Sequence, residues 1–182
     1  MTVRSRSSRS AGDASPGLLD SAGPDADPVE VAKHIVLKQL SHSPKTRHQL
    51  AQVLARRNVP DSAAEAALDR ITELGYIDDA AFARAWVESR HQFKGLSERV
   101  LRRELVERGV AAETIDEVMA VSVDSDSEHA AATALVQKRL RSMGGLDRDT
   151  QTRRLVGMLC RKGYGPALAF SVVNQVLQPT DA

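Results

Sequence analysis

A helical segment with the same pattern of leucines and basic residues occurs three times in the chain, and this internal repeat constrains the fold more than any other feature. The copies run from Gln49 to Val59 (QLAQVLARRNV), from Val100 to Val110 (VLRRELVERGV) and from Arg153 to Tyr164 (RRLVGMLCRKGY). They are offset by 51 and then 54 residues, and the second-last residue of each tolerates left-handed backbone: Asn58, Gly109 and Gly163. Self-similarity at a nearly fixed period predicts a repeat architecture.

Each copy is the middle helix of a unit that reads helix, break, helix, tight turn and helix. The predicted units span residues 29–77, 78–126 and 127–178. No run of alternating β-branched residues and no Asn-Gly or Asp-Gly hairpin turn competes with this helical pattern. The sequence therefore predicts an all-α fold of three tandem three-helix repeats, which together form an elongated, curved molecule.

The first 28 residues differ from the repeats in composition. They are mainly Ser, Gly, Ala, Pro and Asp, and after Met1 only Val3, Leu18 and Leu19 have large apolar side chains that could pack. Such a segment cannot bury enough surface to offset the entropy lost on ordering. We expect a disordered tail over residues 1–28, with a partner-binding arm as the alternative.

The connection between the first two repeats concentrates aromatic side chains. It reads LGYIDDAAFARAW from Leu74 to Trp86 and holds three of the six aromatic residues of the chain. Its glycine suits the left-handed end of a helix, and either of its two aspartates suits the N-cap of the next helix. The predicted structural junction consists of Gly75, Tyr76, Ile77, Asp78, Asp79, Phe82 and Trp86.

Two functional interpretations of this junction compete with a structural one. The aromatic residues Tyr76, Phe82 and Trp86 could stack on bases, and the two aspartates could bind a metal ion. Phe82 and Trp86 lie four residues apart, on one helix face, which favours a core at the joint between repeats. No histidine or further carboxylate stands at ligand spacing to Asp78 and Asp79, so capping is the favoured role and we expect no metal.

The junction and the helices after it resemble the RecX family, whose pattern is G-Y-[IL]-[DN]-D-x-x-[FY]-A followed by a basic helix and a K-G-I-like turn. The residues that carry the resemblance are Leu74–Asp79, Phe82, Ala83, Trp86, Arg90, Lys94, Gly95, Leu101, Leu105, Gly109 and Val110. The resemblance extends from about Val29 to Leu177. Ala111 and Ala112 depart from it, because they stand where an acidic or hydroxyl N-cap is expected.

This resemblance implies a non-enzymatic negative regulator of the bacterial recombinase RecA, built from three tandem three-helix repeats. It implies binding in the groove of the RecA–DNA filament and inhibition of the ATPase, strand-exchange and co-protease activities. Such a protein would modulate DNA repair, homologous recombination and the SOS response. The expected partners are the RecA filament and, more weakly, single- or double-stranded DNA, and we expect a monomer.

The overall charge allows nucleic-acid contact only through a local patch or through a protein partner, because 25 basic and 24 acidic residues leave a net charge of +1. In the second repeat, helical spacing predicts two ion pairs, Glu98–Arg102 and Glu104–Arg108. A solvated, self-paired surface is the alternative to contact with phosphates. The candidate contact residues are Arg99, Arg102, Arg103, Lys138, Arg139, Arg153, Arg154, Arg161 and Lys162.

The remaining features argue against catalysis and for a protein of the cytoplasm. We find no Gly-rich phosphate loop, activated nucleophile or catalytic dyad, so we expect neither enzymatic activity nor a cofactor. The single cysteine, Cys160, suits a reducing compartment, and no apolar run approaches the roughly 18 residues that span a bilayer. The rival hypotheses are a helical-repeat protein that binds DNA directly and an adaptor scaffold.

Overall fold

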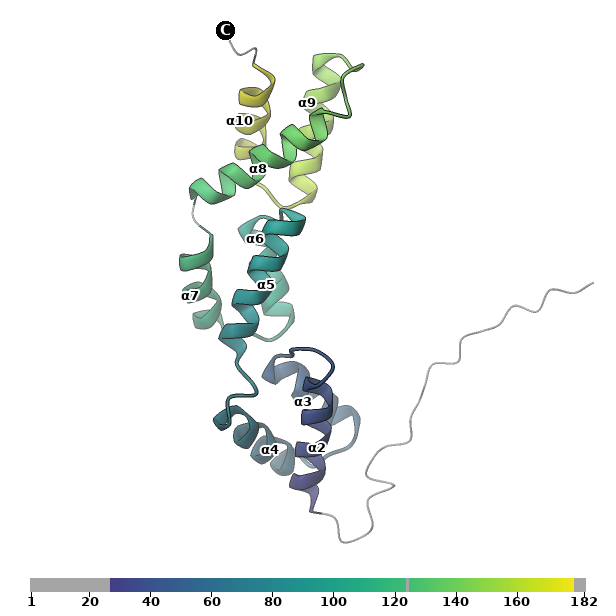
Figure 1. Ribbon diagram of the computed structural model, residues 1–182, viewed down its shortest axis with the longest axis vertical. Coiled ribbons are helices and arrows are strands. Elements are labelled where there is room, and N and C mark those ends of the chain that lie inside the picture. The colour runs from purple at the N-terminus through teal and green to yellow at the C-terminus, as the bar shows by residue number, and fades with distance from the viewer. Residues whose placement is uncertain (1–26, 124, 179–182) are drawn as a thin grey trace, which may run out of the picture.

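The computed structural model of the protein describes residues 27–123 and 125–178, and these residues form nine α-helices and no strand. Figure 1 shows the helices as three groups stacked along one long axis, from α2–α4 through α5–α7 to α8–α10. The predicted all-α fold of three helical repeats in an elongated molecule is confirmed. The predicted tail lies outside the described residues, except for Asp27 and Pro28, which begin the first helix.

Repeat 1 consists of α2 (Pro28–Leu40), α3 (Arg47–Arg56) and α4 (Asp61–Glu73). Helix α3 begins with a capping box, in which Thr46 Oγ1 accepts the N–H of Gln49 and the Gln49 side chain accepts the N–H of Thr46. Two donors left unpaired by the helix are satisfied in this way. The start of the middle helix is therefore fixed by side chains as well as by packing.

Ser62 and Glu65 have the residue types and spacing of a second capping box, but this box is not formed. Helix α4 begins at Asp61, after Pro60 in the N-cap position, and no side chain caps it. Because Ser62 already lies within the first helical turn, its hydroxyl is not at the N-cap position from which it could bind the backbone N–H groups. Packing rather than capping holds this helix in place, since its apolar face is buried against α2 and α3.

Repeat 2 consists of α5 (Asp79–Lys94), α6 (Glu98–Glu107) and α7 (Ala112–Ser122), and repeat 3 of α8 (Ser125–Leu140), α9 (Arg148–Arg161) and α10 (Pro166–Leu177). The sequence predicts a polar linker over residues 124–127, and this is wrong for residues 125–127, which are the first turn of α8. The acidic residues of that turn, Asp126 and Glu128, favour a helix start because they lie at the positive end of the helix dipole.

Each repeat has a hydrophobic core of its own. The leucines at equivalent positions of the three middle helices are all fully buried: Leu50, Leu54, Leu101, Leu105, Leu155 and Leu159. They pack against the first and third helices of the same repeat, so that three separate clusters follow one another along the chain. The repeats are thus small domains whose relative position depends on the contacts between them.

Two equivalent contacts, which we call seam 1 and seam 2, join the repeats. At seam 1, Thr46 Oγ1 donates a hydrogen bond to the carbonyl of Arg108 (2.6 Å), and the N–H of Arg47 donates to Asp79 Oδ1 (2.9 Å). The start of the middle helix in repeat 1 therefore lies against the end of the middle helix in repeat 2.

Seam 2 joins the next two middle helices at equivalent positions, with the backbone N–H of Ser97 as the donor in place of the hydroxyl that donates at Thr46. The N–H of Ser97 donates to the carbonyl of Lys162 (3.1 Å), and the N–H of Glu98 donates to Glu128 Oε1 (3.1 Å). Thr46 and Ser97 are separated by the same 51 residues as the sequence repeat, and they are the buried polar residues of the described chain. The internal repeat therefore encodes the seams as well as the helices.

The glycines at the ends of the middle helices are required by these seams. Gly109 (φ +74°) and Gly163 (φ +96°) both adopt the left-handed conformation. A Cβ at Gly109 would overlap His48, and one at Gly163 would overlap Ser97 and Val100. The equivalent Asn58 is also left-handed (φ +56°), but it is exposed, and no other repeat within the described residues packs against it.

Candidate functional site

The predicted junction connects α4 to α5, and Gly75 and Asp78 act as the sequence predicts. Gly75 ends α4 with φ +76°, and Ile77 is buried in the core of repeat 1. Asp78 is the N-cap of α5, since its Oδ1 accepts the N–H of Ala81 (2.7 Å). Asp79 bonds across seam 1, so the two aspartates divide the capping and joining roles between them.

The spacing of the aromatic residues predicts that they form the core of the joint between repeats 1 and 2. In the structure they do not. Tyr76 is 62% exposed, because the turn after Gly75 directs Ile77 rather than Tyr76 into the core. Phe82 and Trp86 are half-buried and pack against the core of repeat 2. Seam 1 is instead made by polar groups from the ends of α3, α5 and α6.

Trp86 is held by polar contacts on several sides. Its ring stacks on Phe82 with centroids 5.8 Å apart, and its Nε1 donates a hydrogen bond to Glu104 Oε2 (2.8 Å). The guanidinium carbons of Arg90 and Arg108 lie over the ring, at 4.2 Å and 3.6 Å from its centroid. These are cation–π distances, so the indole is fixed by charge as well as by packing.

The expected Glu104–Arg108 ion pair is therefore wrong. Arg108 Nη1 donates to the backbone carbonyl of Glu104 (2.6 Å), while the Glu104 carboxylate receives the Trp86 N–H and lies 3.9 Å from Arg90 Nε. The indole lies where the two side chains would meet, and it takes the carboxylate as its own partner. Arg108 is left without an ion pair among the described residues.

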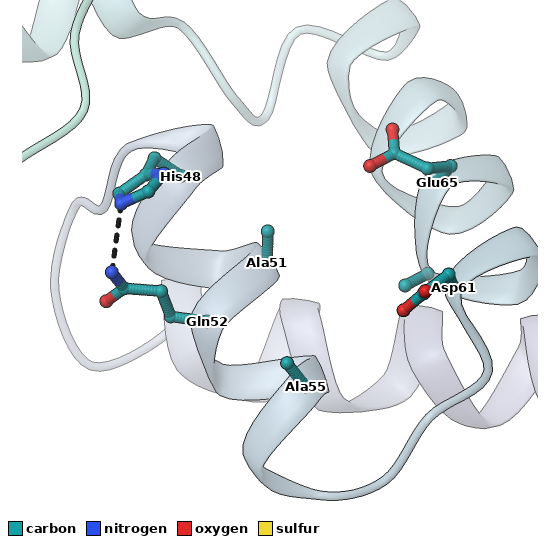
Figure 2. A pocket seen from close by; sticks show the side chains of 7 residues that line it. His48, Ala51, Gln52, Ala55, Asp61 and Glu65 are labelled. Carbon is teal, nitrogen blue, oxygen red and sulfur yellow. Dashed lines mark hydrogen bonds between the residues drawn. The ribbon is translucent and has the colours of Figure 1, made fainter.

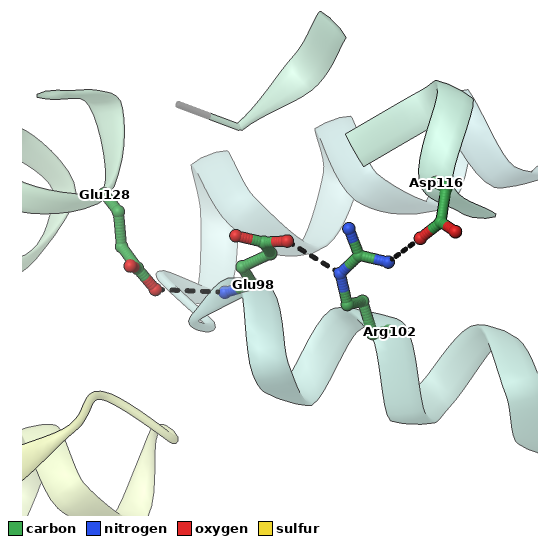
Figure 3. Close-up of polar contacts among 4 residues, drawn as sticks. All are labelled: Glu98, Arg102, Asp116 and Glu128. Atoms are coloured by element: carbon green, nitrogen blue, oxygen red, sulfur yellow. Dashed lines mark hydrogen bonds and ion pairs between the residues drawn. The ribbon is translucent and has the colours of Figure 1, made fainter. Parts of the chain in front are cut away.

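The basic residues predicted on α6 differ in how far they are paired. Figure 3 shows Arg102 between two carboxylates: its Nε lies 2.6 Å from Glu98 Oε1, as predicted, and its Nη1 also bonds Asp116 of α7. These two hydrogen bonds raise the pKa of Arg102. Arg103 pairs with Glu107 (3.6 Å). Arg102 in particular has a structural role, which the sequence does not reveal because Asp116 belongs to another helix.

Two further predicted contact residues belong to seam 2. Arg99 Nε donates to the carbonyl of Gly163 (3.3 Å), and Lys162 Nζ donates to the carbonyl of Lys94. Both side chains hold repeat 3 against repeat 2, and neither forms an ion pair with a described residue. Arg99 remains exposed, so part of its guanidinium still faces solvent.

Repeat 3 carries the largest excess of basic charge. Residues 126–178 contain eight Lys and Arg against four Asp and Glu, whereas residues 78–123 contain seven against nine. Five predicted contact residues of repeat 3 are exposed and form no ion pair within the described part of the chain: Lys138, Arg139, Arg153, Arg154 and Arg161. We refer to these five residues as the basic set of repeat 3.

A shallow pocket of about 280 Å³ lies between α3 and α4. Figure 2 shows His48 and Gln52 on one side of it, joined by a hydrogen bond of 2.9 Å, and Asp61 and Glu65 on the other. Glu65 also pairs with Arg47 at 2.5 Å. No cluster of three or more His, Cys, Asp or Glu side chains within residues 27–123 and 125–178 is placed to hold a metal ion.

A larger groove of about 740 Å³ lies where repeats 1 and 2 meet, and sequence reasoning missed it. Its walls come from the end of α2 and the loop after it, from the turn after α4, and from the outer face of α5. Leu40, Pro44 and Tyr76 line it together with Phe82 and Trp86. The five residues are up to 46 positions apart in the chain, so only the stacking of the repeats brings them together.

Comparison with known proteins gives consistent results. The models of the first, second and third three-helix domains of RecX match residues 32–70, 78–119 and 126–173. The "Regulatory protein RecX" of Streptomyces coelicolor is 46% identical over 172 residues, covering 94% of this chain and 91% of that protein. The protein of the same name from Thermobifida fusca is 44% identical over 161 residues, covering 87% and 84%.

Solved structures show the same fold at low sequence identity. The crystal structure of RecX from Lactobacillus salivarius matches with a TM-score of 0.73 at 14% identity, covering 82% of this chain and 97% of that one. A second crystal structure, of a regulatory protein RecX, matches with a TM-score of 0.67 at 20% identity, covering 82% and 71%. Within the described ranges, no helix is long and apolar enough to cross a membrane.

Proposed function

Because the chain belongs to the RecX family of regulatory proteins, we propose that it is a negative regulator of the RecA recombinase. It binds in the groove of the RecA–DNA filament and inhibits the ATPase, strand-exchange and co-protease activities of RecA. It thereby modulates DNA repair, homologous recombination and the SOS response. It acts in the cytoplasm as a monomer, by contact alone, without catalysis and without a cofactor.

The observation that carries this proposal is the basic set of repeat 3 on one end of an elongated molecule. Lys138, Arg139, Arg153, Arg154 and Arg161 are exposed cations without ion pairs among the described residues. Cations of this kind can neutralise phosphates, or carboxylates on a partner, without first breaking an internal pair. The three repeats joined by two seams offer a long surface that can contact successive protomers of a filament.

The contribution of the other predicted contact residues is smaller. Arg102 and Arg103 are already paired with carboxylates, and exchanging one ion pair for another gains little free energy. Arg99 and Lys162 bind backbone carbonyls at seam 2. These four residues orient repeat 3 relative to repeat 2, and the free cations of repeat 3 supply most of the electrostatic attraction.

The test is a double charge reversal, Arg153→Glu with Arg154→Glu, measured by binding to RecA assembled on single-stranded DNA. We expect a loss of affinity of about tenfold or more. The slope of the logarithm of the binding constant against the logarithm of the salt concentration should also decrease in magnitude by about one for each phosphate contact removed. The matched control is Arg56→Glu with Arg84→Glu, which makes the same change in net charge at exposed, unpaired positions of repeats 1 and 2. Affinity unchanged at two salt concentrations would contradict the role of the basic set.

The function itself is tested by the ATPase activity of RecA on single-stranded DNA. Increasing amounts of the protein should inhibit that activity below an equimolar ratio. The alternative function is direct DNA binding by a helical-repeat protein, which the positive charge of repeat 3 favours. The alternative predicts that the protein holds duplex DNA at physiological salt without RecA and does not inhibit the ATPase at an equimolar ratio.

A further inference from the structure

The groove between repeats 1 and 2 has the composition of a protein-binding site. Its volume of about 740 Å³ is within the usual range for ligand sites. Aromatic side chains from the turn after α4 and from α5 contribute to its lining, together with Leu40 and Pro44. Tyr76, at its edge, is 62% exposed, which leaves a large ring available for contact.

Exposed apolar side chains continue beyond the groove. Leu37 is 41% exposed one helical turn before Leu40, and Leu74 is 51% exposed next to Gly75 at the groove wall. Three of the six large hydrophobic residues that the described chain exposes are thus Tyr76, which lines the groove, and Leu37 and Leu74, which lie close in sequence to lining residues. A concentration of exposed apolar side chains is characteristic of an interaction surface.

The charges at the groove indicate the kind of partner. Lys45 and Arg108 line it, and neither forms an ion pair with any described residue. The one carboxylate of the lining, Asp78, is occupied as the N-cap of α5. Two cations without ion pairs beside apolar lining residues complement an apolar side chain that is followed or preceded by a carboxylate.

We propose that this groove binds an acidic segment of a protein partner, with one apolar side chain inserted against Leu40, Pro44 and Tyr76 and a neighbouring carboxylate on Lys45 and Arg108. Building on the proposed function, the segment belongs to a RecA protomer of the filament. A nucleic-acid base is a poorer fit. Phe82 stacks on the Trp86 ring and two guanidinium groups lie over it, so the indole offers little free face for stacking.

Two variants test the contact without disturbing the core. Tyr76→Ala and Lys45→Glu should each weaken binding to RecA filaments by about tenfold or more, as central interface residues do. The matched controls are Phe170→Ala, which removes an aromatic ring that is 51% exposed on repeat 3, and Arg56→Glu, an exposed charge reversal on repeat 1. Both controls should bind within about twofold of the parent. Thermal unfolding of each variant verifies that the fold is retained.

Trp86 gives a direct measure of occupancy, because it is the single tryptophan of the chain and lines the groove. Replaced biosynthetically by 5-hydroxytryptophan, it can be excited selectively in the presence of RecA. Addition of RecA filaments should protect its fluorescence from quenching by acrylamide in the parent and in Phe170→Ala, but not in Tyr76→Ala at the same filament concentration.

The outcomes separate this proposal from the function on which it rests. If the parent binds filaments and inhibits the ATPase while both groove variants bind equally well, the groove proposal is overturned and the regulatory function stands. If the parent neither binds nor inhibits, both are overturned. If a thymidine homopolymer alone protects the fluorophore, the groove holds nucleic acid and the assignment to a protein segment is wrong.

Discussion

Replacement of Gly109 by alanine should separate two effects on the free energy of unfolding. One is the packing at seam 1, and the other is the general cost of a non-glycine residue in left-handed backbone. Gly109 and Gly75 have nearly the same backbone conformation, with φ of +74° and +76°. A Cβ at Gly75 would meet no atom within 4 Å, whereas a Cβ at Gly109 would overlap the Cβ and Cγ of His48 across seam 1. The two glycines therefore form a matched pair that differs in packing alone.

The expected magnitudes follow from these two terms. Placing an alanine in left-handed backbone costs about 1–2 kcal/mol, which is the full effect expected for Gly75→Ala. Gly109→Ala adds the cost of overpacking, about 1–3 kcal/mol, because the first side-chain atoms of His48 cannot move away without their backbone. The total for Gly109→Ala is then about 2–5 kcal/mol.

Denaturant unfolding followed by circular dichroism measures both losses, and small-angle X-ray scattering measures the shape of each variant. Only Gly109→Ala should change the radius of gyration, because relief of the overlap requires seam 1 to open. Its affinity for RecA filaments should fall for the same reason. Equal destabilisation of the two variants, with unchanged scattering, would refute the conclusion that the seam selects glycine at this position.

Three further predictions concern single side chains. Trp86→Ala should lower the free energy of unfolding by about 2–4 kcal/mol, since it removes a half-buried indole with its hydrogen bond and its cation–π contacts, and a melting temperature within about a degree of the parent would contradict this. Tyr164→Phe should leave the stability in urea unchanged or raise it by up to about 3 kcal/mol, because the buried Tyr164 hydroxyl has no partner among the described residues. Burial, followed by the charge of Glu128, raises the pKa of Tyr164 to about 12, so the parent should lose stability as the pH rises from the ordinary value of about 10 to 12, and Tyr164→Phe should lose less over the same titration. The hydrogen bond from the N–H of Thr150 lowers the pKa of Asp147 in the folded protein. The ionised carboxylate therefore stabilises the fold at pH values above the ordinary pKa, and this stabilisation is lost as the pH falls through the lowered pKa. Asp147→Asn should flatten that part of an acid titration monitored by circular dichroism.

The features that the sequence predicts correctly are those set by short spacings. The leucines of the middle helices recur at helical intervals, and all six are buried as expected. The left-handed conformations of Asn58, Gly109 and Gly163 follow from residue type at a helix end. The Glu98–Arg102 pair forms because both residues lie on one helix face.

The features that the sequence does not predict depend on contacts between distant residues. Asp116 reaches Arg102 from the next helix, and the Trp86 indole takes the Glu104 carboxylate away from Arg108. The groove needs Leu40 of repeat 1 beside residues of repeat 2. Local periodicity cannot specify these contacts, because they depend on the angle at which one repeat stacks on another.

The proposed contact residues remain predictions, but the structure ranks them. Burial and pairing give Arg102 and Lys162 structural roles, and leave Arg153 and Arg154 exposed and free of ion pairs in the described chain. The sequence alone gives no basis for this distinction. Whether or not an arginine has a carboxylate four residues away on its own helix, a carboxylate from another helix can form an ion pair with it.

The seams also determine how a chain of this kind can gain units by duplication. A repeat added before the first would place the start of its middle helix on the turn at Asn58, as Thr46 lies on the turn of repeat 2. Addition at the front therefore demands one substitution, Asn58→Gly. At the other end, α9 has 14 residues where α3 and α6 have 10, so its start projects an extra turn beyond the equivalent position. Growth from that end instead requires deletion of this extra turn, so we expect lengthening by gene duplication to be easier from the N-terminal side.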